Sequence, residues 1–394
     1  MSTESPSTRS LPYEPVNWDT IDDGARIIDV SPRTIAFLLS LLALVALLGY
    51  DVLMVPKDTL PGWDFTRLDW LFVAANLVIV FYLVVPAVQR WDRTKWYWQR
   101  FRSNRAGLVA LIYIVGWYVI TLVSPAILGD PNLDLMHMYQ PPTLFTVPDH
   151  VAMNCLGPVS GGQCQGTLQY PLGSNGTGAG TFKLIVEAMK LAFLVGLVAG
   201  ALMVPIAVAV GSLAGYLGGW VDELLMRYVA VQQAVPAVLI YIIVMFLAGK
   251  SLFLLIVVFG LLNWGGVARL VRSEVIRHRN AGYVMAAQNA GAGNLHVLGK
   301  HVLPNVSGTV VTAITRQIPM LILIQVGLAY VDLNKSDRYS FGKVLAFPFQ
   351  DSAATVQETW WLILFPAIAL AVLVVSFNVL GDALYDTIDP RRDV

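Results

Sequence analysis

Charged side chains are scarce in this sequence. Asp, Glu, Lys and Arg make up 13% of its 394 residues, whereas hydrophobic residues make up 56%, and the mean hydropathy is +0.63. Soluble domains carry roughly a quarter charged residues, so a soluble globular protein is excluded and a membrane protein is indicated. The 26 basic and 26 acidic residues leave no net charge, so no overall field attracts nucleic acid.

Residues that bind metals or nucleotides are also few. Two cysteines and five histidines are present, and none of the histidines has the spacing of a metal site; they are His137, His150, His278, His296 and His301. Gly249-Lys250-Ser251 matches the end of a phosphate-binding loop, but Val244 stands where that loop needs its first glycine. We therefore expect no metal, no cofactor bound by this chain, no catalytic residues and no nucleotide hydrolysis.

Lys and Arg are absent from residues 129–182 and are concentrated in two other segments between apolar runs. Because short cytoplasmic loops retain basic residues, the loop 129–183 is predicted to be external. Two segments are predicted to be cytoplasmic, one containing Arg90, Arg93, Lys95, Arg100, Arg102 and Arg105 and the other Arg269, Arg272, Arg277, Arg279 and Lys300. The N-terminus lacks the basic-then-apolar layout of a cleaved signal peptide, so the first apolar run is expected to stay as a helix.

Eight apolar runs reach the ~20 residues that a helix needs to cross roughly 30 Å of hydrocarbon. They are 34–55, 69–88, 106–128, 187–211, 227–247, 252–270, 310–331 and 360–380. The predicted fold is an all-α integral membrane protein with about eight transmembrane helices. Because this number is even, both termini are predicted to lie in the cytoplasm, in a multi-pass protein of the plasma membrane.

Residues 1–105 contain no recognisable motif and form a predicted N-terminal extension of two spans and a basic linker. That linker clusters aromatic and basic side chains, namely Trp91, Lys95, Trp96, Tyr97, Trp98 and Arg100. Amphipathic rings and cations in this pattern are typical of an anchor at the headgroups of membrane lipid. Nucleic-acid binding is the weaker interpretation in a membrane protein.

The only cysteines, Cys155 and Cys164, both lie in the predicted external loop. In an oxidising compartment, two such cysteines that close a short loop favour a disulfide over two free thiols. The same loop contains Asn175-Gly176-Thr177, an acceptor sequence for glycosylation that a chance match explains equally well.

Polar residues inside the predicted spans are candidates for a translocation path, because each is costly in hydrocarbon and tends to face a cavity or a partner. They are Gln232, Gln233 and Pro236 in one span, and Arg316, Gln317 and Gln325 in another. Arg316 has two interpretations of similar weight: its side chain extends to the cytoplasmic surface, or it lines a polar path beside Pro319.

The segment 274–305 is polar, rich in glycine and too long for an ordinary connection between packed helices. Within it Tyr283, Ala286, Ala287 and Ala290 recur at helical spacing, which predicts a short helix over 281–290 that ends at Gly291. The small apolar face of that helix either docks in a groove of a partner or folds back on its own bundle.

The residues of this segment resemble a known element. Met285-Ala286-Ala287, then Gly291, then Leu303-Pro304-Asn305 are similar to the EAA loop of ABC importer permeases. In that family the loop carries the coupling helix that docks on the cytoplasmic ATPase, so the resemblance implies that these residues, with Tyr283 and Ala290, form a docking site. Met285 replaces the usual glutamate, which removes any contact that the carboxylate makes elsewhere.

Three further elements resemble the C-type subunit of the dipeptide/oligopeptide/nickel group of these permeases. They are YPLGSN at 170–175, GYLGGWVDE at 215–223 followed by Arg227 and Pro236, and FNVLGDAL at 377–384 followed by Asp389-Pro390-Arg391. The resemblance covers 106–394, the predicted permease domain, with six helices. Departures occur at Ala179 and Gly180, where Arg-Asp is usual, and at Gln325 and Asp332.

The resemblance implies a permease subunit of an ATP-driven importer of peptides, with nickel complexes or oligosaccharides as alternative substrates. Its implied partners are a homologous permease subunit in a heterodimer, two cytoplasmic ATPase subunits that use the ATP, and an extracytoplasmic solute-binding protein. A self-sufficient secondary transporter would instead need carboxylates inside its spans for ion coupling, and 106–394 has none at the centre of a span. A membrane scaffold that binds an ATPase without conducting substrate is a third interpretation.

Overall fold

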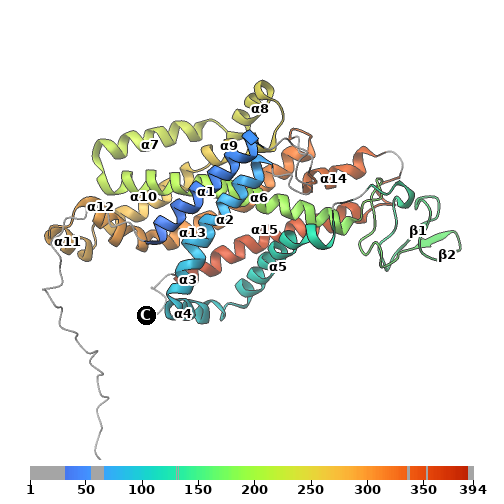
Figure 1. Cartoon of the computed structure of the whole chain (residues 1–394), viewed down its shortest axis with the longest axis horizontal. Coiled ribbons are helices and arrows are strands. Elements are labelled where there is room, and N and C mark those ends of the chain that lie inside the picture. The colour runs from blue at the N-terminus through green and yellow to red at the C-terminus, as the bar shows by residue number, and fades with distance from the viewer. Residues whose placement is uncertain are drawn as a thin grey trace, which may run out of the picture.

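The computed structural model describes residues 32–54, 66–129, 131, 133–334, 338–351 and 354–388. Within them the chain is a bundle of helices with one small β-sheet at one end (Figure 1). Three sequence predictions fall on other residues: Val55 as the end of the first span, the location of both termini, and Asp389-Pro390-Arg391 of the C-terminal element.

The first part of the chain forms helices up to the long loop. They are α1 (Pro32–Met54), α2 (Arg67–Ile79), the π-helical segment η2 (Val80–Val84), α3 (Val85–Gln89), α4 (Trp91–Phe101) and α5 (Arg105–Ile127). The loop contains the 3-10 turn η3 (Leu135–His137) and the strands β1 (Thr146–Pro148), β2 (Val159–Ser160) and β3 (Gln163–Gln165). The strands form an antiparallel sheet in the order β1-β3-β2, which hydrophobic patterning did not predict because each strand is so short.

The second part contains the longest helices. They are α6 (Thr181–Leu217), α7 (Gly219–Ala234), α8 (Ala237–Ala248), α9 (Leu252–Leu262), α10 (Gly265–Arg279), α11 (Gly282–Asn289), α12 (Asn294–Val297), the π-helical segment η4 (Leu298–Val302), α13 (Leu303–Tyr330), α14 (Phe341–Gln350) and α15 (Trp361–Ile388). The end of the bundle that carries the strands is called the β end here, and the opposite end the α11 end (Figure 1).

Helix α6 is the centre of the bundle. It packs against α2, α5, α7, α9, α10, α13, α14 and α15. Its 37 residues correspond to roughly 55 Å at 1.5 Å per residue, so it extends beyond a hydrocarbon layer of roughly 30 Å. Glycines let α10 approach closely: a Cβ at Gly211 would lie 2.4 Å from the carbonyl oxygen of Ala268, and one at Gly215 would lie 2.8 Å from that of Arg272.

Seven helices of the described residues are long and apolar enough to cross a membrane, or eight if one bent pair counts as a single span. The bent pair is α7 and α8, which together cover the predicted span 227–247 and meet at 68°. A straight helix there was wrong because Pro236 has no N–H and pushes Val235 into an extended conformation. The predicted span 252–270 instead continues to Arg279 through a break at Asn263 and Trp264.

Helix α2 of the N-terminal extension packs against the bundle with one face, and most of its other side chains are only partly buried. Its Leu68 and Ala75 belong to one buried cluster with side chains of α6, α8, α9 and α13. Its Asn76 accepts a hydrogen bond from the hydroxyl of Tyr118 on α5. Its Asp69 forms a two-pronged ion pair with Arg338, which precedes α14, at 2.7 and 2.9 Å. By contrast, α1 contacts only α2 and η2 among the closely packed elements and exposes most of its apolar side chains.

Candidate functional site

The segment 274–305 folds at the α11 end as two short helices, α11 and α12, followed by the π-helical segment η4. Helix α11 spans Gly282–Asn289, one residue shorter at each end than the predicted 281–290. Its end at Gly291 is confirmed. Gly291 has a φ of +86°, its N–H donates to the carbonyl oxygen of Gln288 at 2.9 Å, and the N–H of Ala292 donates to that of Ala287 at 3.1 Å. This pair of bonds is a Schellman motif, which satisfies the last carbonyl groups of the helix.

The two faces of α11 differ from the predicted arrangement. Val284 is fully buried in a cluster formed with α6, α7, α10 and α13, and the sequence analysis missed it. Ala287 is half-buried and packs against the same cluster, so it lies between the buried face and the open face of the helix. Tyr283 and Met285 are exposed by 42% and 50%. Val284 is the most apolar residue of this helix, which is the signal that could have identified the inward face.

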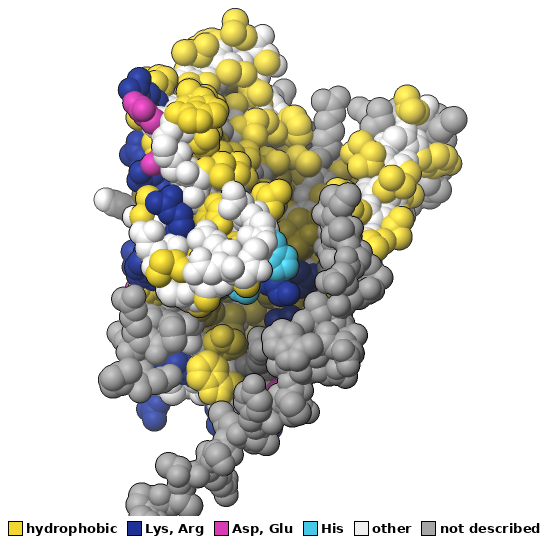
Figure 2. All heavy atoms as spheres, turned by 90° about the vertical axis from the view of Figure 1, so that its left-hand side faces the viewer, with side chains coloured by type: hydrophobic (Ala, Val, Ile, Leu, Met, Phe, Trp, Pro, Cys, Tyr) yellow, Lys and Arg dark blue, Asp and Glu magenta, His cyan; other side chains and the backbone are white. Residues whose placement is uncertain are grey.

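The open surface of α11 therefore includes Tyr283, Met285, Ala286 and Ala290, together with Gln288 and Asn289. Figure 2 looks onto this end of the molecule and shows Lys and Arg side chains distributed around polar and hydrophobic groups. Of the predicted residues that close the segment, Leu303 packs against the buried cluster, whereas Pro304 and Asn305 line a cavity beside α10. Asn305 donates a hydrogen bond to the carbonyl oxygen of His301 at 2.6 Å.

Tyr216 connects both short helices to the end of α6. Its hydroxyl accepts a hydrogen bond from Nε2 of Gln288 on α11 at 3.2 Å and donates one to Oδ1 of Asn294 on α12 at 3.4 Å. Arg279, the last residue of α10, donates from its guanidinium to the carbonyl oxygens of Gly215 and Tyr216 at 3.2 and 3.1 Å. A cation at the end of a helix satisfies its free carbonyl groups and its dipole. The segment GYLGGWVDE thus holds the short helices in place.

A second set of contacts joins α10 to its neighbours. Asp222 of α7 receives two hydrogen bonds from Arg272 of α10, both at 2.5 Å, which is the bidentate geometry of a strong ion pair. Nδ1 of His278 lies 2.9 Å from the hydroxyl of Tyr283 on α11, and burial raises the pKa of that hydroxyl. The short helices, α6, α7 and α10 therefore form one connected unit.

The six residues predicted to line a translocation path fall into two separate groups. Gln232 and Gln233 lie near the end of α7 against Gly265, at which a Cβ would lie 3.0 Å from each side chain, and Pro236 follows at the bend. Arg316 of α13 pairs with Asp382 of α15 at 2.8 Å, which neither interpretation from sequence predicted. No hydrogen bond or ion pair among the described residues joins the two groups.

The remaining members of the second group differ in burial. Gln317 is half-buried, whereas Gln325 is 1% exposed and its Nε2 makes no hydrogen bond with the described residues. The partner of Arg316, Asp382, lies in the FNVLGDAL element, and the contact gives this part of the element a structural role. Gly381 packs so closely on α13 that a Cβ there would lie 2.4 Å from Oγ1 of Thr315, and this approach brings Asp382 to Arg316.

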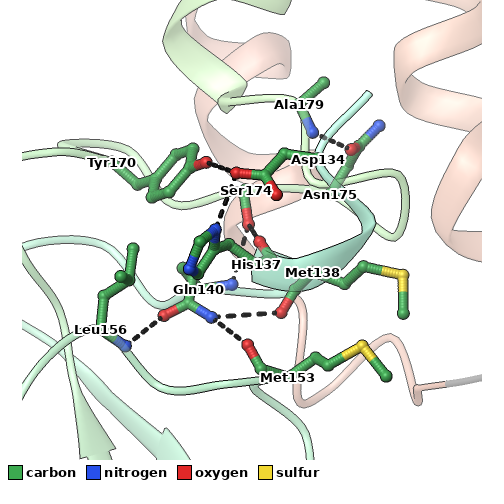
Figure 3. Close-up of polar contacts among 10 residues, drawn as sticks. All are labelled: Asp134, His137, Met138, Gln140, Met153, Leu156, Tyr170, Ser174, Asn175 and Ala179. Carbon is green, nitrogen blue, oxygen red and sulfur yellow. Dashed lines mark hydrogen bonds and ion pairs between the residues drawn. The ribbon is translucent and has the colours of Figure 1, made fainter. Parts of the chain in front are cut away.

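The β end is held by a disulfide and by a network around Gln140. Cys155 and Cys164 are bonded, with their Cα atoms 5.8 Å apart. Figure 3 shows Gln140 bonded to the backbone of Met153 at 2.7 Å and of Leu156 at 3.1 Å. Hydrogen bonds from His137 first and Tyr170 second lower the pKa of Asp134. The loop therefore has a fixed structure of its own.

Asn175 is part of this network and is not available for glycosylation in the folded chain. It is 3% exposed, and its Oδ1 accepts hydrogen bonds from the N–H of Ala179 at 2.9 Å and from the N–H and hydroxyl of Thr177 at 3.0 and 2.8 Å. The contact with Ala179 is drawn in Figure 3. A side chain that closes its own loop in this way cannot enter a modifying enzyme without local unfolding.

Comparisons with known proteins agree with this geometry. Residues 207–394 match the family described as binding-protein-dependent transport system inner membrane component. The chain is 29% identical over 310 residues to a dipeptide transport system permease protein of Lactococcus lactis, which covers 75% of this chain and 89% of the relative. It is 32% identical over 220 residues to an oligopeptide transport system permease protein of Haemophilus influenzae, which covers 55% of this chain and 70% of the relative. A dipeptide permease protein of Bacillus subtilis is 27% identical over 295 residues.

Proposed function

This chain belongs to the family of binding-protein-dependent transport inner-membrane components, and we propose that it forms, with a homologous permease subunit, the path by which an ATP-driven importer takes up short peptides. It is a multi-pass protein of the inner membrane. Dipeptide and oligopeptide permeases are the relatives to which it is similar over most of its length. Nickel complexes and oligosaccharides are alternative substrates that these relatives support less than peptides.

The main support for the proposal is the structure of the α11 end, where one face of a short helix is buried and the other is exposed. Helix α11 presents Tyr283, Met285, Ala286 and Ala290 outward while Val284 fixes its other face in the bundle. An exposed helical face on which two alanines lie beside a tyrosine and a methionine can fit a groove on a partner through shape. The partner proposed is a cytoplasmic ATPase subunit, with Met285 in place of a carboxylate that could otherwise contribute an ion pair.

The contacts of α11 also provide a route for movement. A docked ATPase that displaces α11 would also move α6, because Gln288 of α11 is bonded to Tyr216 of α6. The end of α6 is bonded in turn to Arg279 of α10. Helix α7 would move with α10 because Asp222 is bound to Arg272. Packed elements with two arrangements can convert such a displacement into a change of access across the membrane. We propose that ATP-driven closure of two ATPase subunits moves these helices together and opens the path alternately to each side.

The sidedness follows from charge. The basic segments lie at the α11 end and in α4, and the loop without Lys and Arg lies at the β end. Retention of basic residues in the cytoplasm supports a cytoplasmic α11 end, an extracytoplasmic β end and both termini inside. An extracytoplasmic solute-binding protein would then deliver the substrate to the β end. In this proposal the chain itself binds no ATP and no cofactor, and it contacts lipid but no nucleic acid.

Substitution of Ala286 tests the docking face. In proteoliposomes that contain the complete importer, Ala286→Glu is expected to abolish peptide uptake and the stimulation of ATP hydrolysis by loaded binding protein, because a buried charge without a partner destabilises an interface. Ala286→Ser, which nearly keeps the size of the side chain, is the matched control and should retain both activities. Normal coupling in the Ala286→Glu complex would refute docking at α11.

A further inference from the structure

Helix α4 joins the ends of two membrane spans on one side of the bundle. Only Arg90 separates it from the span Leu68–Gln89, and only residues 102–104 separate it from the span Arg105–Ile127. Figure 1 shows α4 next to the ends of α3 and α5. Because both connections are so short, α4 lies at the membrane surface where the two spans end. In the sidedness proposed above, this is the cytoplasmic surface.

One side of α4 alternates aromatic rings and cations. Intervals of four, three and four residues place a stripe along the helix that consists of Trp91, Lys95, Trp98 and Arg102. All four side chains are exposed, the two tryptophans by 64% and 45%. No hydrogen bond or ion pair joins the side chain of Lys95 or Arg102 to another described residue. The stripe therefore offers two rings and two available cations to the surroundings.

The stripe is fixed to the bundle from behind. Phe101 is 4% exposed and belongs to a buried cluster with side chains of α5 and α15. The ring of Trp98 stacks on that of Phe101, with 6.0 Å between the centroids and 22° between the planes. The hydroxyl of Thr94 donates a hydrogen bond to the carbonyl oxygen of Ala87 on α3 at 2.7 Å. These contacts hold α4 in one orientation, with the stripe on its outer side.

The chemistry of the stripe matches the headgroups of anionic phospholipid. Indole rings prefer the depth of the headgroups, and Lys and Arg pair with lipid phosphates. Residues 90–105 contain six basic residues and one acidic residue, Asp92. In a neutral phospholipid the cationic headgroup cancels the phosphate charge, whereas an anionic phospholipid keeps a net negative charge that basic residues attract. The surface therefore favours anionic over neutral lipid.

Another side of α4 faces the segment 274–305. Tyr97 lines a cavity of about 310 Å³ together with Arg277 of α10 and with Pro304 and Asn305 of α13. The last three residues belong to the segment that the proposed docking of an ATPase would move. Helix α4 is thus a wall of this cavity, and the lipid-facing stripe lies on the same short helix.

We propose that this stripe binds the headgroups of anionic phospholipids in the cytoplasmic leaflet, and that the bound lipid holds α4 as a fixed wall against which the segment 274–305 moves during transport. The ammonium of Lys95 and the guanidinium of Arg102 pair with lipid phosphates, while the rings of Trp91 and Trp98 lie among the headgroups. The sidedness and the role in transport rest on the proposed function. Lipid binding itself does not.

Two measurements compare the wild-type importer with the double variant Lys95→Gln/Arg102→Gln. Native mass spectrometry of the purified complete importer measures its affinity for phosphatidylglycerol, which is anionic, and for phosphatidylcholine, which is neutral. Peptide uptake is then measured in proteoliposomes of phosphatidylcholine with rising fractions of phosphatidylglycerol. Lys95→Arg/Arg102→Lys is the matched control, because it keeps both charges at the same two positions.

Lys95→Gln/Arg102→Gln is expected to weaken phosphatidylglycerol binding about 30-fold, roughly fivefold for each cation, and to leave phosphatidylcholine binding unchanged. The double variant should also need a larger fraction of phosphatidylglycerol for half-maximal uptake. Lys95→Arg/Arg102→Lys should behave as the wild type in both measurements.

Unchanged phosphatidylglycerol affinity in Lys95→Gln/Arg102→Gln overturns the site, and equal losses for the two lipids overturn its selectivity. A lower affinity with the wild-type lipid dependence of uptake overturns the role in transport. Loss of the ATPase subunits with lipid binding retained assigns the two cations to the ATPase and also overturns the site. Absence of peptide uptake by the wild-type importer refutes the proposed function and leaves the binding measurement valid, so the two failures are distinguishable.

Discussion

The Schellman motif that ends α11 gives a prediction whose magnitude follows from one dihedral angle. Gly291 has a φ of +86° and nothing lies within 4 Å of the place where a Cβ would stand. Gly291→Ala therefore creates no clash, and its cost is conformational. An L-residue in the left-handed region is destabilised by about 1–2 kcal/mol, which makes opening of the last turn roughly 5 to 30 times more frequent.

Gly293→Ala is the matched control for this substitution. Gly293 lies two residues further along, is equally open around its Cα, and has ordinary extended angles of −67° and 154°. Alanine fits that conformation without strain and reduces the freedom of the unfolded chain, which offsets the preference for glycine over alanine at the N-cap of α12, so the control should be close to neutral. The two variants make the same change of side chain, and only the one at Gly291 requires a positive φ.

Amide hydrogen exchange of the permease in lipid nanodiscs measures the effect directly. The amides at 291 and 292, which donate to Gln288 and Ala287, should exchange about 5 to 30 times faster in Gly291→Ala and at the wild-type rate in Gly293→Ala. In the complete importer the same loss should reduce peptide uptake per ATP hydrolysed only in Gly291→Ala. Equal exchange in the two variants would refute the conformational argument, because the strain of a positive φ is expected only at Gly291.

Three further predictions concern other contacts. Tyr216→Phe removes two long hydrogen bonds to the short helices, worth about 1 kcal/mol together, and should lower uptake per ATP severalfold with unchanged assembly, as measured in proteoliposomes. The pKa of Asp134 is lowered by His137, so its contribution is present above an ordinary Asp pKa of about 3.9 and is lost as pH falls through the folded value. The thermal midpoint of the β end should decline below about pH 4, and Asp134→Asn should reduce that decline, with the remainder due to Glu358, whose pKa is also lowered. Replacement of Cys155 and Cys164 by serine opens a loop of sequence separation 9 and should cost about 2.5–3 kcal/mol, detectable as faster proteolysis within 129–182 under native conditions.

The helices were largely predictable because hydrocarbon thickness sets their length and because few charges interrupt the apolar runs. Spans 34–55, 69–88, 106–128, 187–211, 310–331 and 360–380 each correspond to one helical stretch, although α6 and α13 extend well beyond the predicted bounds. Apolar length alone marks where a helix crosses a membrane and leaves its ends undefined once the helix continues into water. The bend at Pro236 could have been read from the proline itself.

Features of the site that depend on neighbouring residues in the sequence could be predicted. Features that depend on how distant helices pack could not. Gly291 marks the end of α11 because a left-handed residue after a helix favours glycine. The inward face was missed because α11 has eight residues, and small or apolar side chains occur all around it, so periodicity gives no clear direction. The pairing of Arg316 with Asp382 spans 66 positions and exists only because α13 and α15 pack side by side.

The contact of α2 with the bundle has a consequence for subunit exchange between importers. A permease shortened to residues 106–394 would lose the hydrogen bond that Tyr118 donates to Asn76 and the ion pair of Arg338 with Asp69, and it would expose to lipid the surface that α2 covers. Hydrocarbon accepts the apolar part of that surface but not the polar groups. A grafted core that lacks Tyr118 and Arg338 would therefore keep only the apolar contacts with α2 and would hold this helix less tightly than this chain does.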